Sequence, residues 1–113
     1  MRHFRKMLTA AAYRDLCHLI DDRDGGCVIC GTTLAIEHHH VVDRGEGGDD
    51  AAANMVCLCR HHHRMVDKGA PDRATRMRWR RELMEYLESD HCRAWAEANR
   101  YKLSRIEART VKK

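Results

Sequence analysis

Apolar residues near the start of the chain recur at three- and four-residue spacing, which is the period of one helix face. This stripe comprises Phe4, Leu8, Ala11, Ala12, Leu16, Leu19 and Ile20. Asp24-Gly25-Gly26 ends the pattern, because glycine readily adopts the turn conformations that a helix excludes. We therefore expect an N-terminal helical segment in residues 1–22, with its helix over 3–22 and Cys17 as a small buried side chain.

After residue 26 the sequence predicts shorter elements than the N-terminal helix. β-favouring residues gather between residues 32 and 42, and Asn54 to Leu58 indicates a second short strand or an extended lead-in. A glycine-rich, charged loop lies between them over residues 44–50. Residues 59–68 then favour a helix that Gly69-Ala70-Pro71 stops. The predicted order is strand, loop, strand, helix.

Residues 72–110 predict one long helix or two, followed by a frayed tail. Pro71 and Asp72 suit a helix start, and Ser89-Asp90 marks a break or a new N-cap. The apolar positions on either side of that break are Met77, Leu83, Met84 and Leu87, and then Cys92, Trp95, Ala96, Asn99, Leu103 and Ile106.

Length and composition limit the class of protein. A chain of 113 residues, 43% hydrophobic and 5% aromatic, predicts a single domain over 1–113 with a modest core that a metal or disulfide would staple. The chain shows neither a secretory signal nor the roughly 20 consecutive apolar residues of a membrane span. We expect a soluble protein of a reducing, cytoplasmic compartment with no membrane partner.

Charge is unevenly distributed. Residues 1–63 carry 7 Lys and Arg against 9 Asp and Glu, whereas residues 64–113 carry 14 against 8. The C-terminal half is therefore basic, with a net charge of +6. Either a polyanion such as nucleic acid is its partner, or the charges form a solvated helix surface.

Two close pairs of side chains have the spacing of zinc ligands. Cys27 and Cys30 form a Cys-x2-Cys pair, and Cys59 and His62 form a Cys-x2-His pair after 28 intervening residues. Each two-residue gap lets both side chains converge on one ion, so these four predict a closed structural zinc site. Cys57 is the alternative candidate for the third zinc ligand. Cys59 is preferred because the two-residue gap between Cys59 and His62 matches the spacing of the first pair.

Further ligand-type residues remain inside this frame, more than one zinc ion can use. They are His38, His39, His40, Asn54, His61 and His63. Closure of the zinc site would bring residues 39–40 and residue 63 near each other, because Cys30 and Cys59 share one ion. A second, open metal site is the prediction, and open metal sites perform chemistry.

These motifs, over roughly residues 23–67, resemble the HNH endonucleases of the ββα-metal type, in their zinc-stapled variety. The signature letters fall on His40, Asn54 and His63, with gaps of 13 and 8 residues that are typical of the family. The resemblance implies an α+β fold: a small zinc-stapled ββα-metal core over residues 23–68, flanked by the N-terminal helix and a basic helical extension over residues 72–110.

Two positions depart from the family pattern. His62 stands where many members have cysteine, a tolerable exchange because imidazole nitrogen also binds zinc. Asp43 stands where many have proline, and it places a negative charge near the expected DNA. We assign the catalytic histidine pair to His39-His40, because two apolar residues, then any one residue and Arg44 follow it, as in the family pattern.

The resemblance implies a DNA endonuclease that hydrolyses phosphodiester bonds with one divalent cation, such as Mg²⁺, Mn²⁺ or Ni²⁺. His39 and His63 would hold this cation, and His40 would be the general base. Asn54 would fix the loop that carries His40. Glu37 is either a partner of a histidine ring or a plain surface carboxylate. The alternative function is a zinc-stapled nucleic-acid-binding module without catalysis.

Basic side chains around the motif are candidates for contact with DNA phosphates or are solvated. They are Arg44, Arg60 and Arg64, and Arg76 and Arg80 within an arginine-rich segment around Trp79. Lone nuclease domains of this kind are similar to those encoded in phage and prokaryotic genomes, so the compartment would be the host cytoplasm for a phage protein.

Overall fold

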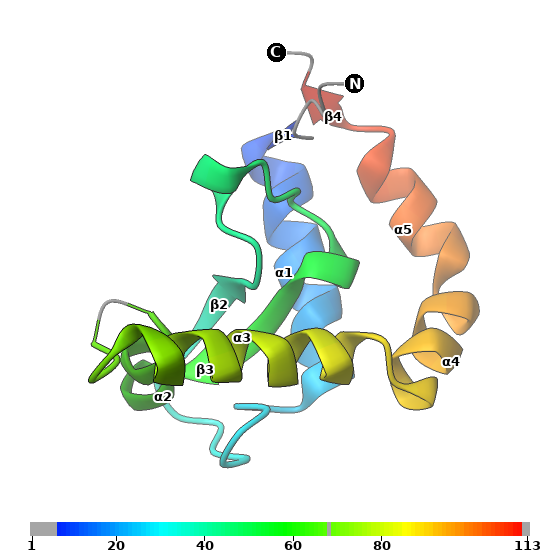
Figure 1. Ribbon diagram of the computed structural model, residues 1–113. Helices are drawn as coiled ribbons and strands as arrows, with labels where there is room; N and C mark the ends of the chain where they lie inside the picture. The colour runs from blue at the N-terminus through cyan, green and yellow to red at the C-terminus, as the bar shows by residue number, and fades with distance from the viewer. Residues whose placement is uncertain (1–6, 68, 112–113) are drawn as a thin grey trace.

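The computed structural model describes residues 7–67 and 69–111 (Figure 1). Its strands are β1 (Met7–Leu8), β2 (Ile36–His40), β3 (Met55–Cys59) and β4 (Thr110–Val111). Its α-helices are α1 (Ala10–Asp24), α2 (Arg60–Val66), α3 (Arg73–Leu87), α4 (Asp90–Ala98) and α5 (Arg100–Glu107), with short 3-10 turns η1 (Arg44–Glu46) and η2 (Ala52–Asn54). The α+β class and the order strand, loop, strand, helix in the middle of the chain are confirmed.

The start of α1 differs from the prediction. The helix begins at Ala10, because the Thr9 hydroxyl accepts a hydrogen bond from the Ala12 N–H at 3.2 Å and caps it. Leu8 belongs to β1, which pairs antiparallel with β4. The tail over residues 110–111 is therefore a paired strand and does not extend the C-terminal helices. Phe4, the first residue of the predicted stripe, lies outside the described residues.

The end of α1 agrees with the sequence. Gly25 adopts a left-handed φ of 66° and closes the helix, as glycine does at this position. The face predicted to be apolar is buried at Ala12, Leu16, Leu19 and Ile20. Cys17 is only half-buried, where the sequence predicts a buried thiol, and packs at the margin of this cluster.

Strands β2 and β3 form an antiparallel hairpin with its two faces covered by different helices. His38 pairs with Cys57 and His39 with Val56, so the two pairs point to opposite faces. Met55 and Cys57 pack toward α1, whereas Val56 and Leu58 pack with helices α2 and α3. All of β3 is buried for this reason, which explains its nearly continuous apolar sequence. Figure 1 shows α1 behind the hairpin and α3 across its front.

Side chains at the end of α1 form hydrogen bonds with backbone groups along the outer edge of β3. Arg23 donates to the carbonyls of Ala52 at 2.6 Å and Met55 at 2.5 Å, and Asp24 accepts from the Cys57 N–H at 2.8 Å. Arg23 and Asp24 are themselves a buried ion pair, with 2.6 Å between Nε and Oδ1. An edge strand would otherwise expose unpaired backbone groups, so this pair fixes the hairpin against α1.

The basic extension contains three helices, where the sequence predicts one or two. Asp72 caps α3 through Thr75, and Ser89 caps α4 by accepting from the Cys92 N–H at 3.2 Å. Asn99 then separates α4 from α5, which ends at Glu107. No helix in the described part of the chain is long and apolar enough to cross a membrane.

Candidate metal centre and catalytic site

The knuckle that carries Cys27 and Cys30 depends on two glycines. Gly31 has a φ of 78° and donates to the Cys27 carbonyl at 2.8 Å, which closes the tight turn expected there. Gly26 has a φ of 136°, and a Cβ at this position would lie 2.7 Å from the Thr32 carbonyl oxygen. The turn therefore brings both cysteine side chains to one side of the backbone.

The second pair of ligands is placed by a helix start. Cys59 is the N-cap of α2, and its sulfur accepts from the His62 N–H at 3.5 Å. Capping ties residue 59 to the residue three positions later. The local geometry that begins α2 thus orients Cys59 and His62 toward each other.

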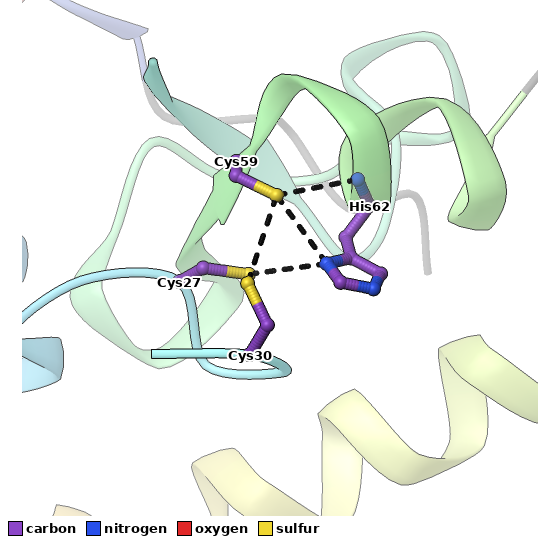
Figure 2. Close-up of side chains that lie close together, drawn as sticks. All are labelled: Cys27, Cys30, Cys59 and His62. Carbon is purple, nitrogen blue, oxygen red and sulfur yellow. Dashed lines mark hydrogen bonds between the residues drawn. The ribbon is translucent and has the colours of Figure 1, made fainter. Parts of the chain in front are cut away.

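The four side chains converge in Figure 2. The Cys59 sulfur lies 3.9 Å from the Cys30 sulfur and 3.3 Å from Nδ1 of His62, and Cys27 lies 3.8 Å from the same nitrogen. Tetrahedral zinc with bonds of about 2.3 Å to sulfur requires ligand separations of about 3.5–3.8 Å. Cys27, Cys30, Cys59 and His62 are therefore positioned to hold a metal such as zinc.

The electrostatics of Cys27 suit a metal ligand. Burial by itself would raise the pKa of this thiol, but hydrogen bonds from the backbone N–H groups of Cys59, Cys30 and Ile29 outweigh it and lower the pKa to about 6. The thiolate, which is the form that metals bind, is thus accessible at neutral pH. Cys57, the rival in the sequence, lies outside this group and its sulfur contacts Asp21 at 3.2 Å instead.

His39 and His63 meet on the face of the hairpin that packs with α2 and α3. Their ring centroids are 5.0 Å apart in an edge-to-face arrangement, although the residues lie on β2 and α2. Burial and then the nearby charge of His63 lower the pKa of His39 to about 4. His39 is therefore neutral at pH 7, which is the form that coordinates a cation. Asp67, Arg76 and Arg80 line a small cleft beside it.

Glu37 is the partner of a histidine ring, and not only a surface carboxylate. Its Oε1 lies 2.8 Å from Nδ1 of His63, and its Oε2 lies 3.6 Å from Nε of Arg60. The hydrogen bond from His63 is the main cause of the lowered pKa of Glu37. With the proton on Nδ1, the lone pair of His63 is on Nε2, which is how carboxylates orient metal-binding histidines.

Asn54 bridges the chain on either side of the loop between the strands. Its side-chain oxygen accepts from the Val42 N–H at 2.9 Å, and its side-chain nitrogen donates to the carbonyls of Val42 and Asp49 at 3.1 and 3.0 Å. Asn54 thereby fixes the backbone two residues after His40.

His40 lies on the α1 side of the hairpin, opposite the face with the His39 and His63 rings, so of residues 39–40 only His39 meets His63 as expected. The alternation of side chains along β2 separates the two histidines. Nε2 of His40 is 2.8 Å from Oδ1 of Asp50, and its ring stacks on Tyr13 at 6.4 Å between centroids. Burial would raise the pKa of Asp50, but the hydrogen bonds from His40 and Arg44 outweigh it and lower the pKa. The sequence reasoning missed Asp50 and Tyr13, because neither belongs to a recognisable spacing.

The arginines predicted to contact DNA occupy different environments. Arg44 pairs with Asp50 at 3.1 Å and lies over the Tyr13 ring, 5.1 Å from its centroid. Arg76 pairs with Asp43 at 3.3 Å and Arg80 with Glu46 at 2.9 Å, so both attach α3 to the loop after β2. Arg64 is exposed. Trp79 packs at the edge of the cluster around Val56, Leu58 and Leu83, which agrees with the core interpretation of that residue.

Comparison with known proteins identifies the segment that contains these side chains. No curated protein and no solved structure gives a significant match to the chain. Residues 27–70, however, match the family model of the HNH endonucleases. This segment runs from the first cysteine of the knuckle past the end of α2, and a domain of this kind indicates a nuclease or nucleic-acid-binding role. The resemblance expected from the motif is thus confirmed: residues 27–70 match the model of the HNH endonuclease family.

Proposed function

We propose that the protein is a metal-dependent DNA endonuclease that hydrolyses phosphodiester bonds. The observation that supports this best is the meeting of His39 and His63, two imidazoles from different elements with one oriented by a carboxylate. This pair is separate from the group around Cys59, so the chain offers a second set of metal ligands. A nucleic-acid-binding module stapled by one zinc has no need of such a set.

His39 and His63 are the residues that would hold a divalent cation. Two imidazoles leave coordination positions open, which distinguishes a site for chemistry from a closed structural site. A cation bound there would neutralise charge on the scissile phosphate and stabilise the leaving 3′ oxygen. Glu37 keeps the His63 ring in the ligand orientation, and the neutral state of His39 leaves its lone pair available.

His40 is the residue proposed to remove the proton from the attacking water. Its ring lies on the α1 side of the hairpin, across β2 from the His39 and His63 rings, so this role requires the water to be bound at the end of β2, where both faces of the strand can be reached. Asp50 holds Nε2 of His40, so Nδ1 is the nitrogen that would accept the proton in this role. The buried Asp50 carboxylate then stabilises the positive charge that forms on the ring. Asn54 supports His40 through the backbone of Val42, as a positioning residue.

Cleavage of supercoiled plasmid with and without Mg²⁺, Mn²⁺ or Ni²⁺ tests the function. The parent protein should nick or linearise the plasmid only with added cation. His40→Ala should lower the rate by about 10²–10⁴-fold, the usual contribution of general base catalysis, with zinc content and DNA binding retained. His39→Ala should weaken the affinity for the catalytic cation.

His38→Ala is the matched control, because His38 belongs to the same run of three histidines on β2 but contacts Asp21 of α1 and not Asp50 or His63. Its effect on cleavage should be mild. An inactive His38→Ala variant together with a fully active His40→Ala variant would show that the motif is assigned to the wrong histidines of the run. A parent protein that binds DNA and cleaves with none of the cations would support the binding module instead.

A further inference from the structure

Three side chains of metal-binding type meet on the α1 side of the hairpin, outside both sites described above. Asp21 comes from α1, His38 from β2 and Cys57 from β3. Oδ1 of Asp21 lies 2.7 Å from Nε2 of His38 and 3.2 Å from the sulfur of Cys57. The three potential ligand atoms lie within 4.8 Å of one another. Because His38 and Cys57 are directly opposed in the register, the hairpin itself holds two of them together.

These side chains line a pocket and do not fill the interior. The pocket has a volume of about 380 Å³, and its other walls are Gly25, Gly26, Thr33 and Ile36. Cys57 is fully buried at its base, whereas the side chains of Asp21 and His38 are 45% and 22% exposed. An ion and a small ligand therefore have access from solvent, and the glycine walls leave space beside the three side chains.

The hydrogen bonds within the cluster converge on one point, where a cation could replace them. A single carboxylate oxygen, Oδ1 of Asp21, is in hydrogen-bonding distance of both the imidazole and the thiol. A divalent ion at this point would replace those two contacts: the thiol would lose its proton to solvent, and the imidazole would carry its proton on Nδ1. One carboxylate, one thiolate and one neutral imidazole together balance the charge of a divalent cation.

We propose that Asp21, His38 and Cys57 form a third metal site, for a borderline-soft divalent ion such as zinc. Thiolate and imidazole ligands select such ions over Mg²⁺ or Ca²⁺. Three protein ligands leave a fourth position that faces the pocket, for water or a small anionic ligand. This site connects α1 to both strands of the hairpin, in addition to the contacts that Arg23 and Asp24 already make. It does not depend on the proposed nuclease function.

Cobalt titration of the zinc-loaded protein tests the proposal, because cobalt bound to a thiolate gives a charge-transfer absorption. The proposed His39 and His63 site contains no thiolate and is silent in this measurement. The parent protein should take up about one cobalt with this absorption, without releasing the zinc already bound. Cys57→Ala, His38→Ala and Asp21→Asn should each abolish the absorption or shift it to cobalt concentrations at least tenfold higher.

Two neighbouring substitutions are matched controls that should keep the absorption. Cys17→Ala removes a thiol of α1 outside the cluster, and Asp22→Asn removes the exposed carboxylate beside Asp21. Zinc content and far-ultraviolet circular dichroism establish that each variant is folded. His38 and Asp21 are partly exposed, so their variants remain informative if Cys57→Ala fails to fold. Absence of the absorption in the folded parent, or its persistence in Cys57→Ala, would overturn the assignment and leave a hydrogen-bonded cluster only.

Discussion

Replacing Asn54 by alanine removes the three hydrogen bonds that hold the chain on either side of the loop between the strands. They join the Asn54 side chain to the backbone of Val42 and Asp49 at 2.9–3.1 Å. A hydrogen bond of this kind contributes about 0.5–1.5 kcal/mol net, and Asn54 is partly exposed, so water replaces some of the loss. We expect Asn54→Ala to lower the free energy of unfolding by about 2 kcal/mol, roughly a 30-fold change in the folding equilibrium.

Urea unfolding of the zinc-saturated protein, followed by tryptophan fluorescence, measures this loss. Asn99→Ala is a matched control, because Asn99 donates one hydrogen bond from its side chain, to the Trp95 carbonyl at 2.9 Å. It should cost about 1 kcal/mol or less. Plasmid cleavage by Asn54→Ala should fall as well, because the backbone that follows His40 loses its support.

Asn54→Asp separates a positioning role from a role as a metal ligand. Aspartate keeps an acceptor for the Val42 N–H, but it sets a carboxylate oxygen against the carbonyls of Val42 and Asp49. We expect it to be at least as destabilising as alanine. The reasoning would be refuted if Asn54→Ala unfolded within about 0.5 kcal/mol of the parent, or if Asn54→Asp were fully stable and active.

Three further predictions concern the metal, a buried carboxylate and the basic helix. Protein purified without added metal should contain about one tightly bound zinc by elemental analysis and should unfold when it is removed; an intact fold without zinc would contradict this. Asp50→Asn should cost about 1–3 kcal/mol at pH 7 in urea unfolding. The lowered pKa of Asp50 means that its contribution is present above about pH 4 and is lost as the pH falls through the folded pKa, so the two proteins should converge in acid; a constant difference would argue against it. Neutralising α3 should weaken binding to all duplexes and flatten the salt dependence more than neutralising four exposed cations of α4 and α5, and equal effects would show that only net charge matters. The α3 set is Arg76, Arg78, Arg80 and Arg81, and the control set is Arg93, Arg100, Lys102 and Arg105.

Features that depend on local spacing were predicted from the sequence. The two-residue gaps place Cys27 beside Cys30 and Cys59 beside His62, because a knuckle and a helix start have fixed local geometry. Gly25 ends α1 and Ser89 caps α4 for the same reason. The expectation that residues 39–40 lie near residue 63 holds for His39, whereas His40 lies on the other face of the hairpin.

Features that join residues remote in sequence were decided by the tertiary structure alone. Asp50 against His40, Asp21 between His38 and Cys57, and the pairing of β1 with β4 obey no local period. The same holds for Arg76 and Arg80, whose attachment to the loop after β2 follows from the packing of α3 against the hairpin. The alternation of β2 sends His38 and His40 toward α1 and His39 toward α2, but only the helices on each face determine what those imidazoles contact.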